Sequence, residues 1–503
     1  MPHDVTPVAI AANGATTRWV MRSAKCLSIC VCVALVGATA LAGEPVDSGA
    51  LDPAFGAGGK VQISATSEAH GASNLTATDT AIQSSGKIVV TGSDDQGDCF
   101  ALRLNIDGSL DTGFGGIGGF PPGFTGYAGC VSDAIVLRPD DRIVMVMHNP
   151  VGGAIFAVQF SASGVPDAAF TNFGYPGVVQ IQPASGDSMY SSRAVIDSDG
   201  TIDIAGFYHQ QSSNNNQFLF VRISADGKAV EPLFQYAFGS GNNQDDHALD
   251  LAIDSQGRYV VGGYHRGAGG NYDCAVIRIT HDLYDVDHAF GNGGQTIVPF
   301  DLGGDNGDFC NALTVVKPDN YIVLGGHASA SVGSGSYQAA VLALLDNSGN
   351  VAQHDCAAVC QDDKFAFAYD NNPSVGASNG ISKLIVDNYD TKFPQILAVG
   401  SGNQPGVPYG LMFGIARLNL PVNTNFVLDS TFNGGSSRGV FFAAHNDGIG
   451  LQTTTNYGLS AAFAKGSLVA AGYTAGAGGN AIAVTRLAAF DGIFKNSFEL
   501  PYY

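Results

Sequence analysis

Short apolar runs that end near a small residue recur seven times along the chain, at spacings of 55 to 74 residues. Between them, glycine and small polar residues mark turns, and other segments alternate apolar with polar positions. Repeats of this length are typical of propellers, solenoids or arrays, in which each unit buries its apolar face against its neighbours. The seven runs are Ile88–Gly92, Ile143–Met147, Ile202–Gly206, Tyr259–Gly263, Ile322–Gly326, Ile396–Gly400 and Leu468–Gly472.

One repeat, taken at residues 78–120, predicts four strands. A strand ends in the turn Ser85-Gly86, and the apolar run follows as the second strand. Phe100–Asn105 alternates as a third strand, turns at Asp107-Gly108, and continues through Leu110–Gly115 into a fourth. Glycine and aspartate suit tight hairpin turns. We therefore predict an all-β, seven-bladed propeller of four-stranded antiparallel blades. Insertions between residues 350 and 430 leave six or eight blades open.

The two ends of the repeat region predict how the ring closes. The first recognisable segment, Leu51–Gly59, matches the end of a repeat, whereas the last repeat stops at Ala483–Leu487 without that segment. We therefore expect Leu51–Ile63 to supply the outer strand of the seventh blade. An open solenoid would instead need polar caps at both ends.

Several of these segments resemble the bacterial delta-60 repeat. The residues that carry the resemblance are Leu51-Asp-Pro-Ala-Phe-Gly-Ala-Gly-Gly-Lys-Val61, Ser85–Gly92, Ala101–Asp111, the unit starting at Leu110 and Asp287–Gly294. The resemblance covers most of residues 47–487. It implies a secreted or surface-linked protein that resembles a β-propeller, and it leaves the biochemical role undefined.

The first 42 residues have the pattern of a secretory leader. Arg22 and Lys25 precede the apolar stretch Cys26–Val36, and small residues follow at Ala38–Ala42. This order is typical of a signal peptide. Met21 is an alternative start of the protein, and an uncleaved signal anchor is the alternative to a cleaved signal peptide. We thus divide the chain into a leader (1–42), a propeller (43–487) and a tail (488–503), and we expect no transmembrane insertion.

Six cysteines follow the leader, and an even number in an exported chain favours disulfides. Cys99 and Cys130 stand before corresponding strands of consecutive repeats, and Cys274 and Cys310 occupy the matching places further on. We predict Cys99–Cys130, Cys274–Cys310 and the local pair Cys356–Cys360. Zinc is disfavoured because paired C-x-x-C units are absent.

The formal net charge of −21 bears on the partners of the protein. Nucleic acids and anionic membrane surfaces bind proteins through clustered Lys and Arg. This chain has 23 Lys and Arg residues against 44 Asp and Glu residues, which argues against both kinds of partner. We expect a partner of another kind, either an extracellular ligand or an envelope protein. Solubility alone would also account for the acidic composition.

Polar residues recur at two places in consecutive repeats. One set falls just ahead of the predicted first strand, which in a propeller lies nearest the axis: Asp79, Asp133, Arg193, Asp250 and Asn311. The second set follows the second strand: His148, His209, His265 and His327. Because these strands are antiparallel, both sets should lie on one face around the axial mouth. We consider a binding site there, against the simpler interpretation that each side chain holds a loop.

Metal and catalytic chemistry are only weakly indicated. The acidic loops Asp94–Asp98 and Asp301–Asp308 carry oxygen ligands of the kind that calcium prefers, but they lack the twelve-residue loop with its closing Glu. Calcium is thus the one candidate cofactor, and a solvated loop is the alternative. The motif G-x-S-x-G occurs at Gly376–Gly380, around Ser378, without a strand-to-helix elbow. We assign no catalytic residue.

These observations favour an exported propeller that acts as a binding or scaffold module at or outside the cell envelope. The alternative is an extracellular hydrolase or lyase that works at the axial face. A third class, a structural surface-layer component, would associate with itself through the blade rims. An enzyme requires a deep axial pocket with converging reactive groups, whereas a scaffold requires a closed channel.

Overall fold

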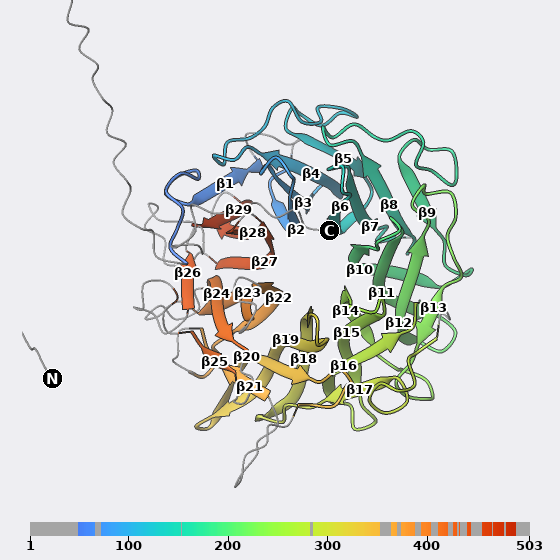
Figure 1. Ribbon diagram of the computed structural model, residues 1–503, viewed down its shortest axis with the longest axis vertical. Coiled ribbons are helices and arrows are strands. Elements are labelled where there is room, and N and C mark those ends of the chain that lie inside the picture. The colour runs from blue at the N-terminus through green and yellow to red at the C-terminus, as the bar shows by residue number, and fades with distance from the viewer. Residues whose placement is uncertain are drawn as a thin grey trace, which may run out of the picture. The chain divides into compact units, whose positions relative to one another are not determined.

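The protein folds into seven antiparallel β-sheets arranged as the blades of a ring (Figure 1). The computed structural model describes residues 49–65, 72–151, 153–281, 285–352, 364–369, 374–387, 394–403, 411–420, 426–429, 432, 440–443, 455–464, 466–476 and 479–488. The predicted propeller of four-stranded blades is confirmed. The leader 1–42, the tail after residue 488 and the pair Cys356–Cys360 lie outside the described residues.

Blades one to four each consist of four consecutive strands, counted from the axis outward. Blade one contains β2 (Leu75–Ile82), β3 (Ile88–Asp94), β4 (Asp98–Leu104) and β5 (Phe124–Ala128). Blade two contains β6 (Val131–Leu137), β7 (Ile143–His148), β8 (Ile155–Phe160) and β9 (Val178–Ile181). Blade three contains β10 (Ser188–Ile196), β11 (Ile202–Gln210), β12 (Asn215–Ile223) and β13 (Phe234–Tyr236). Blade four contains β14 (His247–Ile253), β15 (Tyr259–Arg266), β16 (Tyr272–Ile279) and β17 (Gln295–Val298).

The last three blades include a fifth strand and the ring closure. Blade five contains β18 (Gly303–Val316), β19 (Tyr321–Val332), β20 (Gly335–Leu345) and β21 (Lys364–Phe367). Blade six contains β22 (Gly380–Asp387), β23 (Gln395–Asn403), β24 (Leu411–Asn419) and β25 (Val427–Leu428), and β26 (Val440–Ala443) also pairs with β24. Blade seven contains β27 (Thr455–Ala464), β28 (Ser467–Gly476), β29 (Gly479–Leu487) and β1 (Lys60–Ser64).

Each of the seven apolar runs found in the sequence lies in the second strand of a blade, where neighbouring sheets cover both faces. Buried residues therefore fill these strands almost continuously, and all five residues of Ile88–Gly92 in β3 and of Tyr259–Gly263 in β15 are buried. Sheets that pack face to face stand about 10 Å apart, so the apolar residues of one blade form a shared core with the next. One such core joins Val90 and Leu102 of blade one to Val469 and Ile482 of blade seven.

An arginine, an aspartate and a phenylalanine form a clasp that joins one blade to the next. In blade one, Arg103 Nε lies 2.7 Å from Asp111 Oδ2, and the guanidinium carbon lies 4.6 Å from the centre of the Phe114 ring. Phe114 in turn packs under the hairpin of blade two at Gly164, whose φ of 86° favours glycine. A Cβ at Gly164 would lie 2.7 Å from that ring. The hairpin thus needs glycine for both its backbone conformation and this close contact.

The same clasp recurs in blades four and six, and blade two carries a variant of it. Arg278, Asp287 and Phe290 form it in blade four, with a guanidinium-to-ring distance of 4.6 Å. Blade six forms it with Arg417, Asp429 and Phe432, at a guanidinium-to-ring distance of 5.0 Å. In blade two Gln159 replaces the arginine and donates a 2.7 Å hydrogen bond to Asp167. The motif that carries the delta-60 resemblance is therefore explained by blade packing.

The ring closes through the same clasp. Strand β1 pairs with β29 over five residue pairs, from Lys60 opposite Thr485 to Ser64 opposite Ala481. Asp52 binds Arg486 at 2.8 Å, and the Arg486 guanidinium lies 4.6 Å from the Phe55 ring. Phe55 is fully buried beside Gly108 of blade one. The predicted closure by Leu51–Ile63 agrees with this pairing.

Two predicted disulfides are confirmed, and each joins neighbouring blades. Cys99 of β4 is bonded to Cys130, which stands just before β6, with their Cα atoms 5.6 Å apart. Cys274 of β16 is bonded to Cys310 of β18, with their Cα atoms 5.1 Å apart. All four cysteines are buried. The disulfides fasten blade one to blade two and blade four to blade five.

We predict that Phe55→Ala lowers the free energy of unfolding by about 3–5 kcal/mol, because it empties a fully buried ring site. Chemical denaturation followed by circular dichroism measures the change. The control is Val427→Ala at a half-exposed position, for which about 0.5 kcal/mol or less is expected. Equal effects of the two substitutions would contradict the proposed role of Phe55 in closing the ring.

Candidate functional site

The innermost strand of every blade contains a β-bulge at the same place, and the residue after it defines one level of the ring. The seven residues at this level are Asp79, Ala134, Arg193, Asp250, Ala312, Lys383 and Ser460. Asp133 and Asn311 are the bulged residues themselves, one position earlier. The polar set from the sequence therefore lies within the inner strands, and it divides between two levels.

At the first level, four charged side chains from four different blades form an axial charge cluster: Asp79, Arg193, Asp250 and Lys383. Arg193 lies 3.0 Å from Asp79 through Nη1 and 3.0 Å from Asp250 through Nε. Lys383 Nζ lies 3.8 Å from Asp250 Oδ1. Arg193 of blade three thus joins blade one to blade four, and blade six contributes the second cation. The two carboxylates and two cations neutralise one another.

The carboxylates of this cluster also bind neighbouring backbone. Asp79 accepts a 3.0 Å hydrogen bond from the Ile135 N–H of blade two and another from the Ser460 hydroxyl of blade seven. Asp250 accepts a 2.8 Å hydrogen bond from the Leu313 N–H of blade five. Burial alone would raise the pKa of Asp79, but the charges of Arg193 and Lys383 and these hydrogen bonds hold it below its usual range.

The cations respond to the same surroundings in opposite ways. Burial favours loss of the Arg193 proton, but the paired Asp79 and Asp250 raise the pKa of Arg193 above its usual value. Burial lowers the pKa of Lys383, and the neighbouring Arg193 adds to that decrease. Buried charges need partners and hydrogen bonds to be tolerated. The charges of the axial charge cluster are therefore paired with one another at the hub, while Arg193 Nε is close to Asp250 without a well-aligned hydrogen bond.

Each of the four predicted histidines has its own partner on one side of the ring, which we call the histidine face. His148 Nδ1 lies 2.8 Å from Asp133 Oδ2, and His209 Nδ1 lies 2.8 Å from Asn216 Oδ1. The remaining pairs are His265 with Asp246, 2.6 Å from Nδ1 to Oδ1, and His327 with Asn311, 3.3 Å from Nδ1 to Nδ2. The described residues contain no group of three His, Cys, Asp or Glu side chains able to hold a metal ion.

Seven stacked or edge-packed rings run along the histidine face from blade two to blade five, and we call them the ring arc. Successive centroids lie 3.9–5.2 Å apart, and all seven rings are half-buried. In order they are His148, Tyr190, Phe207, His247, Tyr264, Phe309 and His327. Six of them form directly opposed cross-strand pairs at one register of blades three, four and five. Only the two ends of this arc, His148 and His327, are among the histidines predicted from the repeat pattern.

Asp133, Ser191 and His148 resemble a catalytic set but are connected differently. The Ser191 hydroxyl donates to Asp133 Oδ2, the same oxygen that contacts His148. A serine nucleophile would instead donate to the free imidazole nitrogen. Burial raises the pKa of Asp133 despite its His148 contact. Ser378, in the G-x-S-x-G motif, donates a 2.8 Å hydrogen bond to Gln338 and lies between a turn and β22.

The two predicted acidic loops differ in how many of their carboxylate oxygens already accept hydrogen bonds. Asp94 accepts backbone hydrogen bonds from Gln96 and Asp98, and Asp95 binds Ser73 and Asn74. The other predicted loop, Asp301–Asp308, is largely strand instead, because β18 begins at Gly303. Within it Asp308 is fully buried, and its Oδ1 has no hydrogen-bond partner among the described residues. Calcium binding at either loop stays a prediction.

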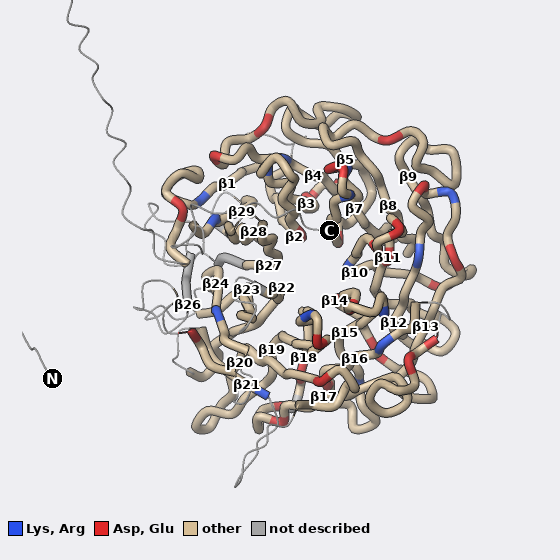
Figure 2. The backbone as a smooth tube through the Cα atoms, in the orientation of Figure 1, with Lys and Arg blue, Asp and Glu red and all other residues tan. Residues whose placement is uncertain are grey.

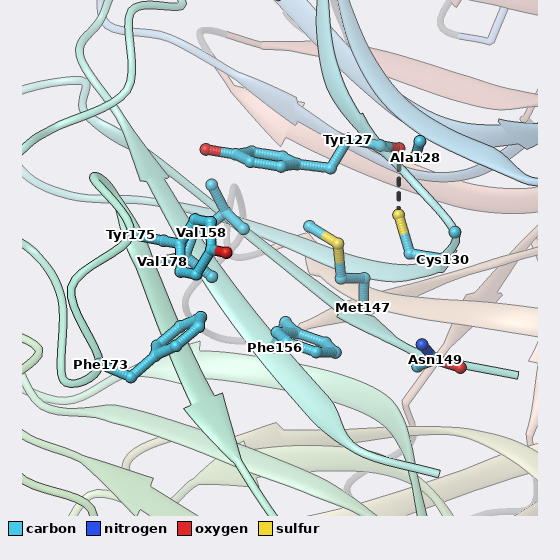
Figure 3. Close-up of a pocket in the computed structure, with 11 residues that line it drawn as sticks. Tyr127, Ala128, Cys130, Met147, Asn149, Phe156, Val158, Phe173, Tyr175 and Val178 are labelled. Carbon is cyan, nitrogen blue, oxygen red and sulfur yellow. Dashed lines mark hydrogen bonds between the residues drawn. The ribbon is translucent and has the colours of Figure 1, made fainter. Parts of the chain in front are cut away.

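A pocket of about 330 Å³ opens at the rim between blades one and two, and we call it the rim pocket (Figure 3). Its lining comes from the end of β5, the end of β7, β8, the start of β9 and the segment before β9. The residues that line it are Tyr127, Ala128, Gly129, Cys130, Met147, Asn149, Phe156, Val158, Phe173, Tyr175 and Val178. No motif in the sequence marks this site, because its residues come from two repeats and none of them is charged.

Acidic residues outnumber basic ones over the blades and their connecting loops, in line with the net charge of −21 (Figure 2). Many of the arginines are bound within clasps or in the axial charge cluster, as Arg103, Arg278 and Arg193 are. No helix within the described part of the chain has the length and apolar character needed to cross a membrane.

Comparisons with known proteins support the propeller fold. A family model described as "Domain of unknown function (DUF5122) beta-propeller" matches residues 83–114 and 198–229. Together with the seven blades, this match supports a β-propeller repeat protein. No curated protein matches the sequence.

Several solved structures resemble the chain at low sequence identity. Polysaccharide lyase Uly1 is 11% identical over 82% of this chain and 90% of its own, with a TM-score of 0.46. Trypanosoma rangeli sialidase, in complex with the inhibitor DANA, is 9% identical over 73% of this chain and 56% of its own, with a TM-score of 0.37. The α-L-arabinofuranosidase Arb93A from Fusarium graminearum is 10% identical over 72% and 97%, with a TM-score of 0.37. We draw no functional conclusion from similarities this weak.

We predict that Arg193→Met lowers the free energy of unfolding by about 3–5 kcal/mol, because it leaves Asp79 and Asp250 buried with one cation between them. Denaturant titration measures the loss. Lys228→Met is the control, since Lys228 pairs with Asp226 at the surface and should contribute about 1 kcal/mol or less. A loss no larger than that of the control would contradict the structural importance of the axial charge cluster.

We predict that Asp308→Asn stabilises the protein at pH 8 but not near pH 4. Burial and the nearby Asp273 and Asp301 raise the pKa of Asp308 to about 6, although its backbone hydrogen bonds act in the opposite direction. Between about pH 4 and 6 the native state holds a proton that the unfolded chain has released, so stability falls as pH rises. The gain at pH 8 is up to about 3 kcal/mol. Thermal melts at both pH values test this, with the exposed Asp319→Asn as control; an equal gain at both would contradict it.

Proposed function

We propose that the protein is an exported binding or scaffold propeller. In this proposal an extracellular ligand or an envelope protein binds at the histidine face. Export is supported by the basic, apolar and small-residue order of residues 22–42. The two interblade disulfides are consistent with an oxidising compartment. The acidic composition argues against nucleic acid as the partner.

The observation that carries this proposal is the axial charge cluster. Its carboxylates are buried, bound to cations and bound to backbone N–H groups, so they are not free to act as acid or base at the mouth. An active site of the kind expected at a propeller axis needs reactive groups that converge on open space. A closed and neutral hub is what a binding platform requires.

The histidine face offers the chemistry for contacts. The ring arc presents half-buried ring edges and hydroxyl groups from four consecutive blades. Aromatic residues with a polar end favour interfaces that are partly apolar and partly hydrated. Asp245 stays ionised beside the arc, because its hydrogen bonds with His247, Tyr272 and Asn216 outweigh burial and hold its pKa well below the usual range.

A hydrolase or lyase is the second candidate, and the Asp133–His148 pair favours it. A histidine whose Nδ1 is held by a buried carboxylate can accept a proton at Nε2. His148 is the one predicted histidine that combines such a carboxylate with a place at the end of the ring arc. In this candidate it would act as the general base on an extracellular polymer.

One experiment separates the two functions. Secreted protein is mixed with neutral and acidic polysaccharides and with envelope fractions; affinity electrophoresis measures retention, and assays for new reducing or unsaturated ends measure cleavage. We expect retention without products. Turnover that is abolished by His148→Asn but kept by His209→Asn would overturn the proposal and support the enzyme. Reversible self-association in ultracentrifugation, with no retained polymer or envelope protein, would instead indicate a surface-layer component.

A further inference from the structure

The rim pocket has the size and form of a small-molecule site and lies apart from the ring arc. Its volume of about 330 Å³ is within the range of ligand pockets, which begin near 300 Å³. It is set between the outer strand of blade one and the sheet of blade two, whereas the ring arc begins with His148 on the opposite side of blade two. Met147 and Asn149, on either side of His148 in sequence, line the pocket.

Aromatic rings form two opposing walls of the rim pocket, and sulfur atoms form part of the surface between them. Figure 3 places the ring of Tyr127 on one side and the rings of Phe156 and Phe173 on the other. Met147 lies between them, with its Sδ 3.2 Å from Cys99 Sγ of the buried disulfide. Rings and polarizable sulfur favour contact with another aromatic ring more than with a saturated group of the same size.

The lining also determines the charge of what can bind. It contains no Asp, Glu, Lys, Arg or His, and Asn149 supplies its one side-chain amide. An ion that entered this space would lose hydration without gaining a partner, which is costly. Asn149 Oδ1 already accepts a 2.8 Å hydrogen bond from the Val151 N–H, and the Tyr127 hydroxyl donates to Pro176 O at 3.4 Å. A neutral ligand with one polar group can turn that group toward the Tyr175 hydroxyl at the mouth and bury the remainder.

The mouth of the pocket exposes apolar surface to water. Tyr175 is 66% exposed and Phe173 is 39% exposed, and their ring centroids lie 5.1 Å apart. Contiguous exposed apolar side chains around a concavity mark a ligand site more often than they occur by chance on a soluble surface.

We propose that the rim pocket binds a neutral small molecule built on one or two fused aromatic rings and carrying a hydroxyl or similar polar group. The ring lies between Tyr127 and the phenylalanines, above Met147 and Cys130, and Tyr175 covers it from the solvent side. This site is independent of the histidine face and of whatever binds there.

Calorimetric titration of the secreted full chain with three matched probes tests the ligand class. The probes are p-cresol, 4-methylcyclohexanol, which keeps the shape but lacks the aromatic ring, and 4-methylbenzoate, which adds a negative charge. We expect p-cresol to bind about tenfold or more tightly than either of the others. Equal affinity for the saturated analogue, tighter binding of the anion, or no p-cresol binding would overturn the proposal.

Three variants locate the site. Ala128→Trp places a large side chain at an exposed lining position and should abolish p-cresol binding, whereas Tyr175→Ala removes the cover and should weaken binding by about tenfold. Tyr321→Ala, at an exposed tyrosine of blade five, is the matched control and should leave binding unchanged. Unchanged binding in both Ala128→Trp and Tyr175→Ala would overturn the assignment, and circular dichroism verifies that each variant is folded.

The disulfide beneath the pocket gives an independent readout. Cys130 lines the pocket, so bound p-cresol should slow reduction of Cys99–Cys130 by a phosphine, measured by alkylation and peptide mapping. Cys274–Cys310, in the corresponding place of blades four and five, is the internal control and should be reduced at an unchanged rate. Equal protection of both disulfides, or of neither, would argue against binding in the rim pocket.

Discussion

The clasp of arginine, aspartate and phenylalanine is the interaction on which the architecture depends. Its arginine lies on the third strand of a blade, and its aspartate follows in the same repeat. Its phenylalanine reaches forward under the next hairpin, where only glycine leaves enough space for the ring. Because each clasp spans two blades, it fastens a sheet to the next one wherever it occurs, and Asp52, Phe55 and Arg486 make the same contact where the first strand of the repeat region joins the last blade.

The second constraint acts at the hub. Seven inner strands bring their bulges to one level, and a propeller must fill or hydrate the space between them. Here four blades supply charges of opposite sign, and the remaining positions at that level are small, such as Ala134 and Ala312. The result is a closed hub whose charges are paired with one another. Surfaces for binding are therefore left to the faces and the rim, where the ring arc and the rim pocket lie.

The two sites differ in chemistry for a geometric reason. Near the start of the innermost strand the blades lie close together, so Tyr190 pairs with Phe207 within blade three and Phe207 contacts His247 of blade four. Residues near the outer strands spread apart as the blades diverge, and the rings of Tyr127 and Phe156 leave a space between them (Figure 3). Stacked rings offer edges and polar atoms to a partner, whereas separated rings offer their faces.

The repeat, the four strands of each blade, the ring closure and the two described disulfides are all predictable from the chain. These features depend on local signals, namely apolar runs, Gly-containing turns and cysteines at matching places in consecutive repeats. Which polar residues meet depends instead on how the blades pack. A bulge shifts register by one residue, so Asp79 reaches Arg193 while Asp133 turns to His148, and Lys383 joins from a blade whose repeat is poorly marked. The rim pocket likewise forms where two sheets diverge, and that distance is set by packing between blades rather than by the spacing of residues within one.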